Sequence, residues 1–245
     1  MMEMDSGIIL RVVPFKEKDA MITAMTPDGY RSFFARNVFD LRGKNAPALQ
    51  KYTEVELALR EGPSGGRYLN RATIIYSASK AMRSLARMSA LEICGEAVLK
   101  AIIEAEDVRL IYPYLQHAIK EISEAGNPLS QVLIIFAQIL KINGYGLNVD
   151  YCIYCNSPKD IVAIDYQRGG YICKNCFEHQ LTAKTGKEQL MISRFIFRCA
   201  PADMERAIFS PEEALVIYRE LLQALGEQLG IYLQSAKLFA ESIRN

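Results

Sequence analysis

Residues 151–176 have the sequence YCIYCNSPKDIVAIDYQRGGYICKNC, which contains two Cys-x-x-Cys pairs. Seventeen residues, 156–172, separate the pairs, a spacing typical of four-cysteine zinc sites. Two intervening residues allow a tight turn to direct both thiolates of a pair at one ion, and two such turns complete a tetrahedron. The run 161–166 between the pairs reads as a strand, which predicts a zinc ribbon. The expected metal ligands are Cys152, Cys155, Cys173 and Cys176.

We expect this site to hold one structural Zn²⁺, because four protein ligands leave no open coordination position. In a reducing compartment, closely paired cysteines are more typical of metal ligands than of disulfides. The alternative, in which the thiols are redox-active or carry no metal, stays open at this point. His179 follows Cys176 by three residues but is not needed as a ligand when four cysteines are present. Cys94 and Cys199 fall within helical apolar patterns and are expected to be core residues.

Apolar residues at helical spacing lie on both sides of this segment. Before it, Asn127-Pro128 suits the N-cap and first residue of a helix. After it, the run 210–213 (SPEE) predicts a capping box with Ser210 at the N-cap. The apolar stripes are Leu85, Met88, Leu91, Gly95, Val98 and Ile102; Val108, Ile111, Leu115, Ala118 and Ile122; Leu129, Val132, Phe136 and Ile139; and Leu215, Tyr218, Leu222, Leu225, Leu229 and Tyr232. They predict an all-α domain at 80–148 and 180–245, with the zinc ribbon inserted at 149–179.

Residues 1–79 have the pattern of β-structure. The expected strands are Gly7–Pro14, Ala20–Thr26, Tyr30–Val38, Tyr52–Arg60 and Tyr68–Tyr76. In the fourth, Val55, Leu57 and Leu59 alternate with more polar residues, as in a half-buried strand. Five short antiparallel strands suit a small closed barrel, most often an oligonucleotide-binding (OB) fold, although an SH3-like barrel fits the pattern nearly as well. The predicted fold class is therefore α+β and multidomain: an OB-like barrel, then an all-α helical domain with an inserted four-cysteine zinc ribbon.

The composition restricts the class of protein. The chain has 245 residues, of which half are hydrophobic, so a disordered or collagen-like chain is excluded. The longest apolar run, Val132–Leu140, is far shorter than a membrane span, and the acidic N-terminus does not resemble a signal peptide. We therefore expect a cytoplasmic protein. Phosphate-binding loops, dinucleotide fingerprints and nucleophile elbows are absent, so an enzyme is not supported.

Basic residues are concentrated in one part of the predicted barrel, although the net charge of the chain is only +1. Between Arg31 and Lys51 there are five basic residues and one acidic residue. The strand 2–3 face of an OB barrel commonly binds oligonucleotides, with rings stacked on bases and cations near phosphates. Phe33 and Phe34 are adjacent on a strand, so they cannot both point outward. The candidate nucleic-acid contacts are Arg31, Phe33, Phe34, Arg36, Arg42, Lys44, Lys51, Lys80, Arg83 and Arg87.

The chain resembles the RecO family of DNA repair and recombination proteins. A small barrel, a helical domain and a four-cysteine ribbon between helices occur in that order, and the match covers most of the chain. The short motifs that carry the resemblance are GIILRV at 7–12, KEKDAMIT at 16–23, ALQKYTEVEL at 48–57 and INGYGL at 142–147, followed by the two cysteine pairs.

The resemblance implies a non-enzymatic mediator of the RecFOR pathway, acting at the nucleoid in the bacterial cytoplasm. Such a protein binds single- and double-stranded DNA, anneals complementary strands and, with RecR, helps RecA replace single-stranded DNA-binding protein. The acidic C-terminal tail of that binding protein would dock on the helical domain. The DNA-contacting loop of the family would correspond to Val38–Pro47, which carries fewer basic residues than is frequent in the family. We expect Arg42 and Lys44 to contact phosphate.

Two other classes remain compatible with the residues alone. A zinc-ribbon protein could bind RNA or a ribosomal partner through the same barrel, without a role in repair. A structural adaptor could instead be recognised through its helical surface and bind no nucleic acid. Annealing of DNA strands separates the mediator from both alternatives, and a preference for RNA would favour the first of them.

Overall fold

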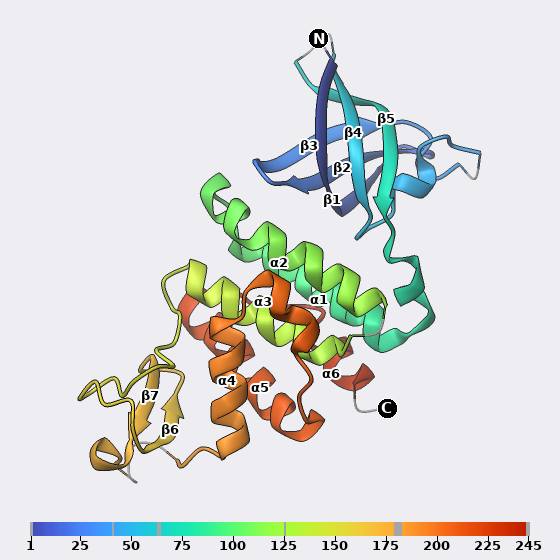
Figure 1. The fold of residues 1–245 in the computed structure, drawn as a ribbon. Helices are drawn as coiled ribbons and strands as arrows, with labels where there is room; N and C mark the ends of the chain where they lie inside the picture. Colours follow the sequence, from blue (N-terminus) through green and yellow to red (C-terminus); the bar gives the residue numbers. More distant parts are fainter. Residues whose placement is uncertain (1, 41, 63–64, 125, 179–182, 244–245) are drawn as a thin grey trace.

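The computed structural model describes residues 2–40, 42–62, 65–124, 126–178 and 183–243. These residues form a β-barrel, a helical region and a small two-stranded ribbon (Figure 1). The barrel and the ribbon lie at opposite ends of the helical region. This architecture confirms the predicted fold class. The expected boundary between the ribbon and the second helical segment, at residues 179 and 180, lies outside the described residues, as does His179.

The barrel contains five strands, close to their predicted positions. They are β1 (Met2–Phe15), β2 (Asp19–Thr26), β3 (Gly29–Ala35), β4 (Glu54–Glu61) and β5 (Arg67–Tyr76). The strands follow the order β1-β2-β3-β5-β4, and β4 pairs with β1 to close the barrel. The contact between β3 and β5 is parallel and consists of one residue pair, Phe34 and Tyr68. This topology is OB-like, which resolves the choice between the two barrel types.

Alternation along the strands fills the barrel interior. Val55, Leu57 and Leu59 of β4 are fully buried there together with Phe33 of β3. A 3-10 helix, η1 (Ala46–Leu49), adds further apolar side chains. Strand β1 is buried on both faces near its centre: its neighbouring side chains face the barrel interior and the helices in turn. The barrel is therefore packed directly on the helical region.

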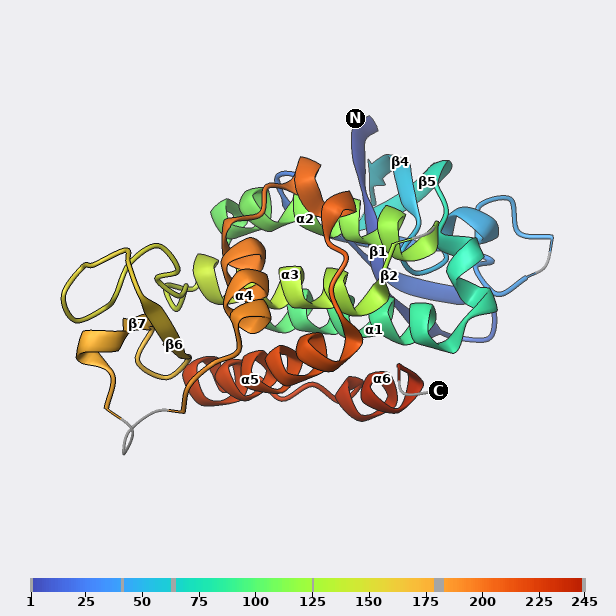
Figure 2. The same ribbon diagram turned by 60° about the horizontal axis from the view of Figure 1, so that its bottom comes forward.

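The helical region contains six α-helices among the described residues, joined in places by 3-10 turns. The helices are α1 (Leu85–Ala101), α2 (Ala105–Ser123), α3 (Pro128–Ile142), α4 (Lys187–Arg198), α5 (Pro211–Leu229) and α6 (Ala236–Ser242), and the turns are η2 (Ala78–Arg83) and η4 (Pro201–Arg206). Helix α3 is central and packs against α1, α2, α4 and α5 (Figures 1 and 2). Every residue from Leu129 to Leu140 is buried, so α3 has no solvent-facing side over that length. Asn127 caps this helix as predicted, because its Oδ1 accepts from Leu129 N at 3.0 Å.

Two of the predicted apolar stripes extend too far. The α1 stripe begins with Leu85 and Met88, but these side chains are 57% and 43% exposed. The α5 stripe was expected to include Tyr232, whereas Gly230, with φ of 67°, ends the helix and leaves Tyr232 76% exposed. Ser210 does occupy the N-cap position of α5, yet its hydroxyl makes no capping hydrogen bond. The predicted capping box is therefore not formed.

The barrel meets the helices through buried tyrosines. The Tyr30 hydroxyl donates to the Ile102 carbonyl at 3.0 Å, at the end of α1. The Tyr52 hydroxyl donates to Glu92 Oε2 at 2.7 Å, and its ring lies against Gly95. Burial raises the pKa of both hydroxyls, so they remain neutral hydrogen-bond donors at ordinary pH.

The ribbon consists of β6 (Ile161–Asp165) and β7 (Gly170–Cys173), followed by the turn η3 (Lys174–Cys176). It is attached to α4 at several points. Asp150 accepts from Arg198 at 2.5 Å and forms a second ion pair with Arg194 at 3.0 Å. The Tyr166 hydroxyl bonds Ser193 Oγ at 2.9 Å. Among the described helices, none combines the length and apolar character that crossing a membrane requires.

Candidate nucleic-acid interface and metal centre

Four cysteine thiols meet at the tip of the ribbon. The sulfur atoms of Cys152, Cys155, Cys173 and Cys176 all lie within 4.8 Å of one another, and no disulfide joins them. The Sγ atoms of Cys155 and Cys173 are 3.6 Å apart. A tetrahedron of thiolates about 2.3 Å from a zinc ion has its sulfurs about 3.8 Å apart, so the arrangement fits a single ion. The four cysteines could therefore bind a metal ion.

Local backbone structure positions the first cysteine pair. Cys152 N donates to the Ser157 carbonyl, and Asn156 N donates back to the Cys152 carbonyl at 2.9 Å. Asn156 adopts a φ of 58°, which lets the chain turn tightly after Cys155. Burial alone would raise the pKa of the Cys152 thiol, but hydrogen bonds from the backbone of Cys173, Tyr154 and Cys155 outweigh burial and bring the pKa to about 6. The surroundings of Cys152 therefore favour its thiolate, the form that binds metal.

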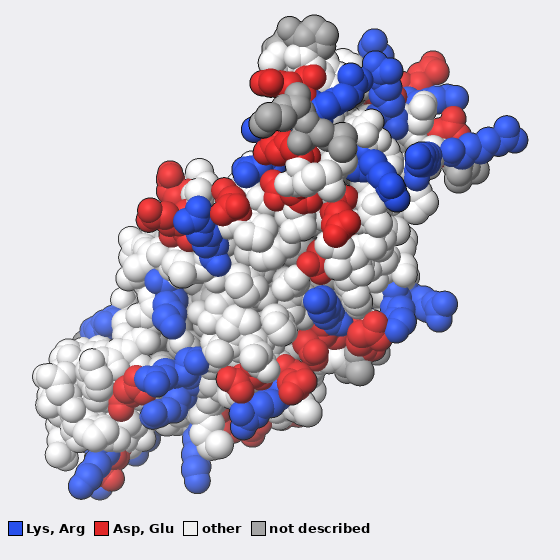
Figure 3. Space-filling model, turned by 45° about the horizontal axis from the view of Figure 1, so that its top comes forward, with Lys and Arg blue, Asp and Glu red and all other residues white. Residues whose placement is uncertain are grey.

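The barrel carries most of its basic side chains without a carboxylate partner. Residues 1–79 contain eleven Lys and Arg, and only four form ion pairs: Lys18 with Asp40, Arg31 with Asp5, Lys51 with Glu92, and Arg67 with Glu3. Among the described residues the other seven have no ion pair, namely Arg11, Lys16, Arg36, Arg42, Lys44, Arg60 and Arg71. Lys and Arg side chains project from the barrel at the upper right of Figure 3. Unpaired cations of this kind are available to neutralise phosphate.

The structure separates the predicted contacts into available and engaged residues. Arg36, Arg42, Lys44 and Arg83 are exposed and have no ion pair within the described chain. Phe34 is half-buried on the outer face. The engaged residues are Arg31 and Lys51, paired as above, Lys80, which pairs with Glu124, and Arg87, which donates to the carbonyls of Ile122 and Glu124.

Phe33 must be corrected as a surface contact. Its side chain is fully buried in the barrel core, because alternation on β3 turns Phe33 inward and Phe34 outward. Only the second of these rings can reach a ligand. Within the predicted DNA-contacting loop 38–47, Leu41 lies outside the described residues.

Three aromatic rings form a row on the outside of the barrel. Phe34 is the central ring, with Phe15 of β1 and Tyr68 of β5 on either side, each 5.6 Å away between ring centroids. Lys16 Nζ lies 5.7 Å from the Phe15 centroid, and the Arg60 guanidinium lies 5.7 Å from the Tyr68 centroid. Proteins that bind single-stranded nucleic acids commonly combine aromatic rings, on which bases stack, with cations that contact the phosphates.

A cavity of about 210 Å³ opens beside two of these rings. Its walls are Phe34, Arg36, Asn37, Lys44, Asn45, Arg60, Tyr68, Leu69 and Asn70. Three of these residues are cations and none is acidic, so the cavity has a positive potential that favours a phosphate or a base edge rich in acceptors. The Asn45 side chain also supports the wall, because its Oδ1 accepts from Ala72 N at 3.1 Å.

Comparison with known proteins agrees with this geometry. The model described as recombination protein O N terminal matches residues 1–78, and the model described as recombination protein O C terminal matches residues 82–237. The chain belongs to the recombination protein O (RecO) family.

Three relatives illustrate the extent of the similarity, each named DNA repair protein RecO. The protein of Geobacter sulfurreducens is 26% identical over 94% of this chain and 93% of its own length. That of Halalkalibacterium halodurans is 21% identical over 94% of this chain and 91% of its own length. That of Frankia casuarinae is 27% identical over 71% of this chain and 73% of its own length.

Sequence reasoning missed several residues of this RecO barrel surface. Phe15, Tyr68 and Arg60 lie on strands far from β3 in the chain, and they approach Phe34 only when the barrel closes. A signal was present in the fifth strand: Tyr68 had to face outward if the next residue, Leu69, packed against the core. The sequence alone does not show the register between β3 and β5, which places Phe34 beside Tyr68.

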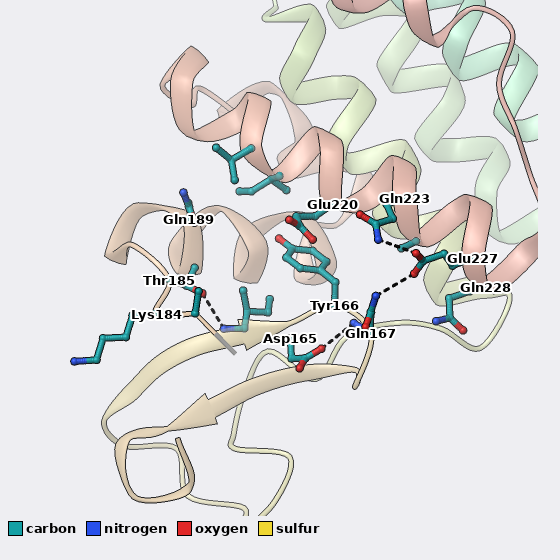
Figure 4. Close-up of a pocket in the computed structure, with 15 residues that line it drawn as sticks. Asp165, Tyr166, Gln167, Lys184, Thr185, Gln189, Glu220, Gln223, Glu227 and Gln228 are labelled. Carbon is teal, nitrogen blue, oxygen red and sulfur yellow. Dashed lines mark hydrogen bonds between the residues drawn. The ribbon is translucent and has the colours of Figure 1, made fainter. Parts of the chain in front are cut away.

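A larger cavity, of about 370 Å³, lies between the RecO ribbon and α5 (Figure 4). Asp165, Glu220 and Glu227 line it together with glutamine side chains. Gln167 Nε2 and Gln223 Nε2 both donate to Glu227. Burial, with the charges of Asp165 and Glu227, raises the pKa of Glu220. Three carboxylates repel phosphate, so this cavity is not part of the nucleic-acid interface.

A basic and apolar depression lies on α4. Met191, Phe195, Arg194, Arg198 and Arg206 line it, and Met191 is 62% exposed. Two of these arginines hold Asp150 of the ribbon, as described above, and Arg206 pairs with Asp203 at 3.1 Å. The surface thus already binds carboxylates beside exposed apolar side chains.

Proposed function

We propose that this protein is a recombination mediator that binds single- and double-stranded DNA and anneals complementary strands. Together with RecR it would help load RecA onto DNA coated by single-stranded DNA-binding protein. The role is non-enzymatic and belongs to the bacterial cytoplasm, at the nucleoid. The observation that carries the proposal is the set of unpaired cations around a partly exposed row of aromatic rings on an OB-like barrel. Membership of the RecO family supports it.

We assign the DNA contact to the outer face of the barrel. Arg42 and Lys44 would neutralise phosphates, while Phe34 offers a face for a base and Arg36 lies beside it. Neutralisation of phosphates lowers the repulsion between two complementary strands held on the same protein, which favours annealing. Lys51, Lys80 and Arg87, which already have partners in the protein, are assigned a structural role.

We assign one structural Zn²⁺ to the four ribbon cysteines. Soft thiolate donors in a closed tetrahedral set are the usual ligands of structural zinc. The ribbon itself has two short strands and little core, so metal binding would supply most of its folding free energy. When bound, the ion holds the two knuckles together and offers no open position for catalysis.

Each part of the chain has a proposed role. The barrel, residues 1–79, contacts DNA, and the helical domain, residues 80–148 and 180–245, holds protein partners. The ribbon, residues 149–179, stabilises the outer end of the molecule. The basic and apolar depression on α4 is the proposed dock for the acidic tail of single-stranded DNA-binding protein, because three arginines line it beside the exposed side chain of Met191. The action with RecR rests on the family alone.

Annealing of complementary oligonucleotides coated with the cognate single-stranded DNA-binding protein tests this function. We expect the protein to accelerate annealing when the coat carries its acidic tail and to lose most of that acceleration when the tail is removed. Docking on the coat raises the local concentration of the mediator, which explains the dependence. A protein that accelerates nothing and fails to bind DNA at low salt would contradict the proposal. Equal or stronger activity on RNA would favour an RNA-binding role.

A further inference from the structure

The small cavity between β3, β4 and β5 has a size and chemistry that the general DNA-binding role does not explain. Its volume, about 210 Å³, is below the roughly 300 Å³ at which pockets for drug-sized ligands begin. We propose that this cavity is a socket for a single unpaired nucleobase of a DNA strand, with guanine preferred. The socket rests on the proposed DNA-binding function and adds base selectivity to it.

The apolar walls of the socket are the rings of Phe34 and Tyr68. They meet edge to face, with centroids 5.6 Å apart and an interplanar angle of 68°. This angle leaves a corner between the rings, in which a planar base can contact one ring face while its edge meets the other. Gly62 supports the Tyr68 ring: a Cβ there would lie 2.1 Å from Cε2 of Tyr68, so the ring lies directly against the backbone. The backbone thereby holds the Tyr68 ring in place.

The charged groups that line the socket are all hydrogen-bond donors. Arg36, Lys44 and Arg60 can only donate, and the described residues that line the cavity include no carboxylate. Asn45 Oδ1 is already occupied by the backbone of Ala72, which leaves its amide nitrogen as a donor. Guanine presents two adjacent acceptors, O6 and N7, which arginine recognises with both arms of its guanidinium. Adenine and cytosine would each turn an amino group toward these donors, so they fit less well.

The position of the socket also favours single strands. A base enters it only after leaving its stack, and extraction from a duplex costs free energy that an unpaired base does not require. Lys44, which lines the cavity and is exposed, can hold a phosphate next to the inserted base. Double-stranded DNA would therefore contact the cations without filling the socket.

Changes to the ligand provide the first test, because they need no protein variant. Binding of the full-length protein to a short oligothymidylate is compared with the same strand carrying one central guanosine. We expect roughly tenfold tighter binding with guanosine, in line with one two-armed base contact. Inosine, which keeps O6 and N7, should retain the gain, and 7-deazaguanosine, which lacks N7, should lose it. Equal affinity for all these strands would overturn the socket while leaving the DNA-binding function standing; absence of any binding would overturn both.

Protein variants provide the second test. Arg36→Lys and Arg60→Lys keep the charge and remove the planar fork, so they should abolish the guanosine gain with little change in salt dependence. Tyr68→Leu should weaken single-strand binding, and Tyr68→Phe should restore it. Arg67→Lys, on the same strand but paired with Glu3, is the matched control and should keep the gain. Loss of the gain in this control would contradict the assignment. If equimolar free deoxyguanosine monophosphate displaces the oligonucleotide, the cavity is a site for free nucleotides. That result would contradict a socket for a base within a DNA strand.

Discussion

The ring of Tyr52 lies so close to Gly95 of α1 that a Cβ at residue 95 would be 2.7 Å from Tyr52 Cε1 and 2.9 Å from its hydroxyl oxygen. Tyr52 itself has a φ of 63°, which is unusual for a bulky residue. The hydrogen bond to Glu92 and the close packing on the helix hold this conformation. The pair joins the barrel to the helical region and requires a glycine in the middle of a helix.

We therefore predict that Gly95→Ala destabilises the protein. Overpacking costs about 1–3 kcal/mol, and the better helix propensity of alanine offsets about 1 kcal/mol of it. The expected net loss in free energy of unfolding is therefore up to about 2 kcal/mol, measured by urea unfolding. Gly226→Ala in α5 is the control, because the added Cβ would meet only the exposed Tyr232 ring, at 3.2 Å. That variant should be neutral or slightly stabilised. Equal destabilisation of both variants would show that helix context, and not Tyr52, is responsible.

Replacement of Arg42 and Lys44 together with alanine should weaken DNA binding and reduce its dependence on salt. If each side chain contacts one phosphate, the slope of log K against log salt should flatten by about 1.4 for single strands and about 1.8 for duplexes. A titration of affinity against salt concentration measures this slope. Lys51→Ala and Lys80→Ala are matched controls, since both lysines are ion-paired within the protein, and they should leave the slope unchanged. An unchanged slope in the double variant would contradict the phosphate contacts.

Purified protein should contain about one equivalent of zinc per chain, as four thiolate ligands imply. Cys155→Ser should lower the zinc content and loosen the ribbon, which hydrogen exchange at β6 and β7 can follow. The amides of the barrel, at the other end of the molecule, should keep their protection. Cys199→Ala, outside the cluster, is the control and should retain the metal. Less than half an equivalent of zinc in wild-type protein purified without chelator would contradict a structural zinc site.

Glu96 should make the free energy of unfolding fall as the pH is lowered into the acid range. Burial alone would raise its pKa, but hydrogen bonds from Lys100, Ser235 and Gln234 outweigh burial and lower the pKa to about 2. The folded pKa lies below the unfolded value of about 4.3, so the stabilisation is complete above about pH 5 and is lost as pH falls toward about 2. After allowance for solvent screening, we expect a loss of about 1–3 kcal/mol across this range. Urea unfolding at a series of pH values should show a shallower decline for Glu96→Gln.

Glu220 provides a comparison of opposite sign. Its folded pKa is raised by burial and by the charges of Asp165 and Glu227, so the ionised carboxylate destabilises the folded state near neutral pH. Glu220→Gln should therefore increase stability at about pH 7 and have little effect below about pH 4, where the carboxyl is protonated in both states. A decrease at neutral pH would indicate that Glu220 is a structural partner.

Much of the fold could be predicted because local patterns and tertiary packing agree. The alternation of Val55, Leu57 and Leu59 indicates a barrel strand, and their burial confirms it. The cysteine spacing predicted a cluster that the structure contains. Leu85 and Met88 show where periodicity misleads: they continue the apolar stripe of α1 beyond the part of the helix that other elements cover.

The barrel surface could be predicted less well, because partners across strands decide which side chains are free. Arg31 is basic and lies on the expected strand, yet Asp5 of β1 pairs with it at 3.0 Å. Arg60 is not among the contacts predicted from the sequence, yet it lines the cavity and forms no ion pair within the described residues. Strand register and barrel closure decide that Arg31 is ion-paired and that Arg60 is not. Local composition does not reveal the register or the closure.

The one paired position between β3 and β5 joins the two residues whose rings face the cavity, Phe34 and Tyr68. In the proposed socket these two positions would serve both barrel closure and base recognition, so a substitution at either would affect both. A substitution at this seam between β3 and β5 would change a wall of the cavity and the packing beside the strand pair together. Redesign of ligand preference in this barrel would best begin at Arg36, Lys44 and Arg60, which surround the seam without forming it.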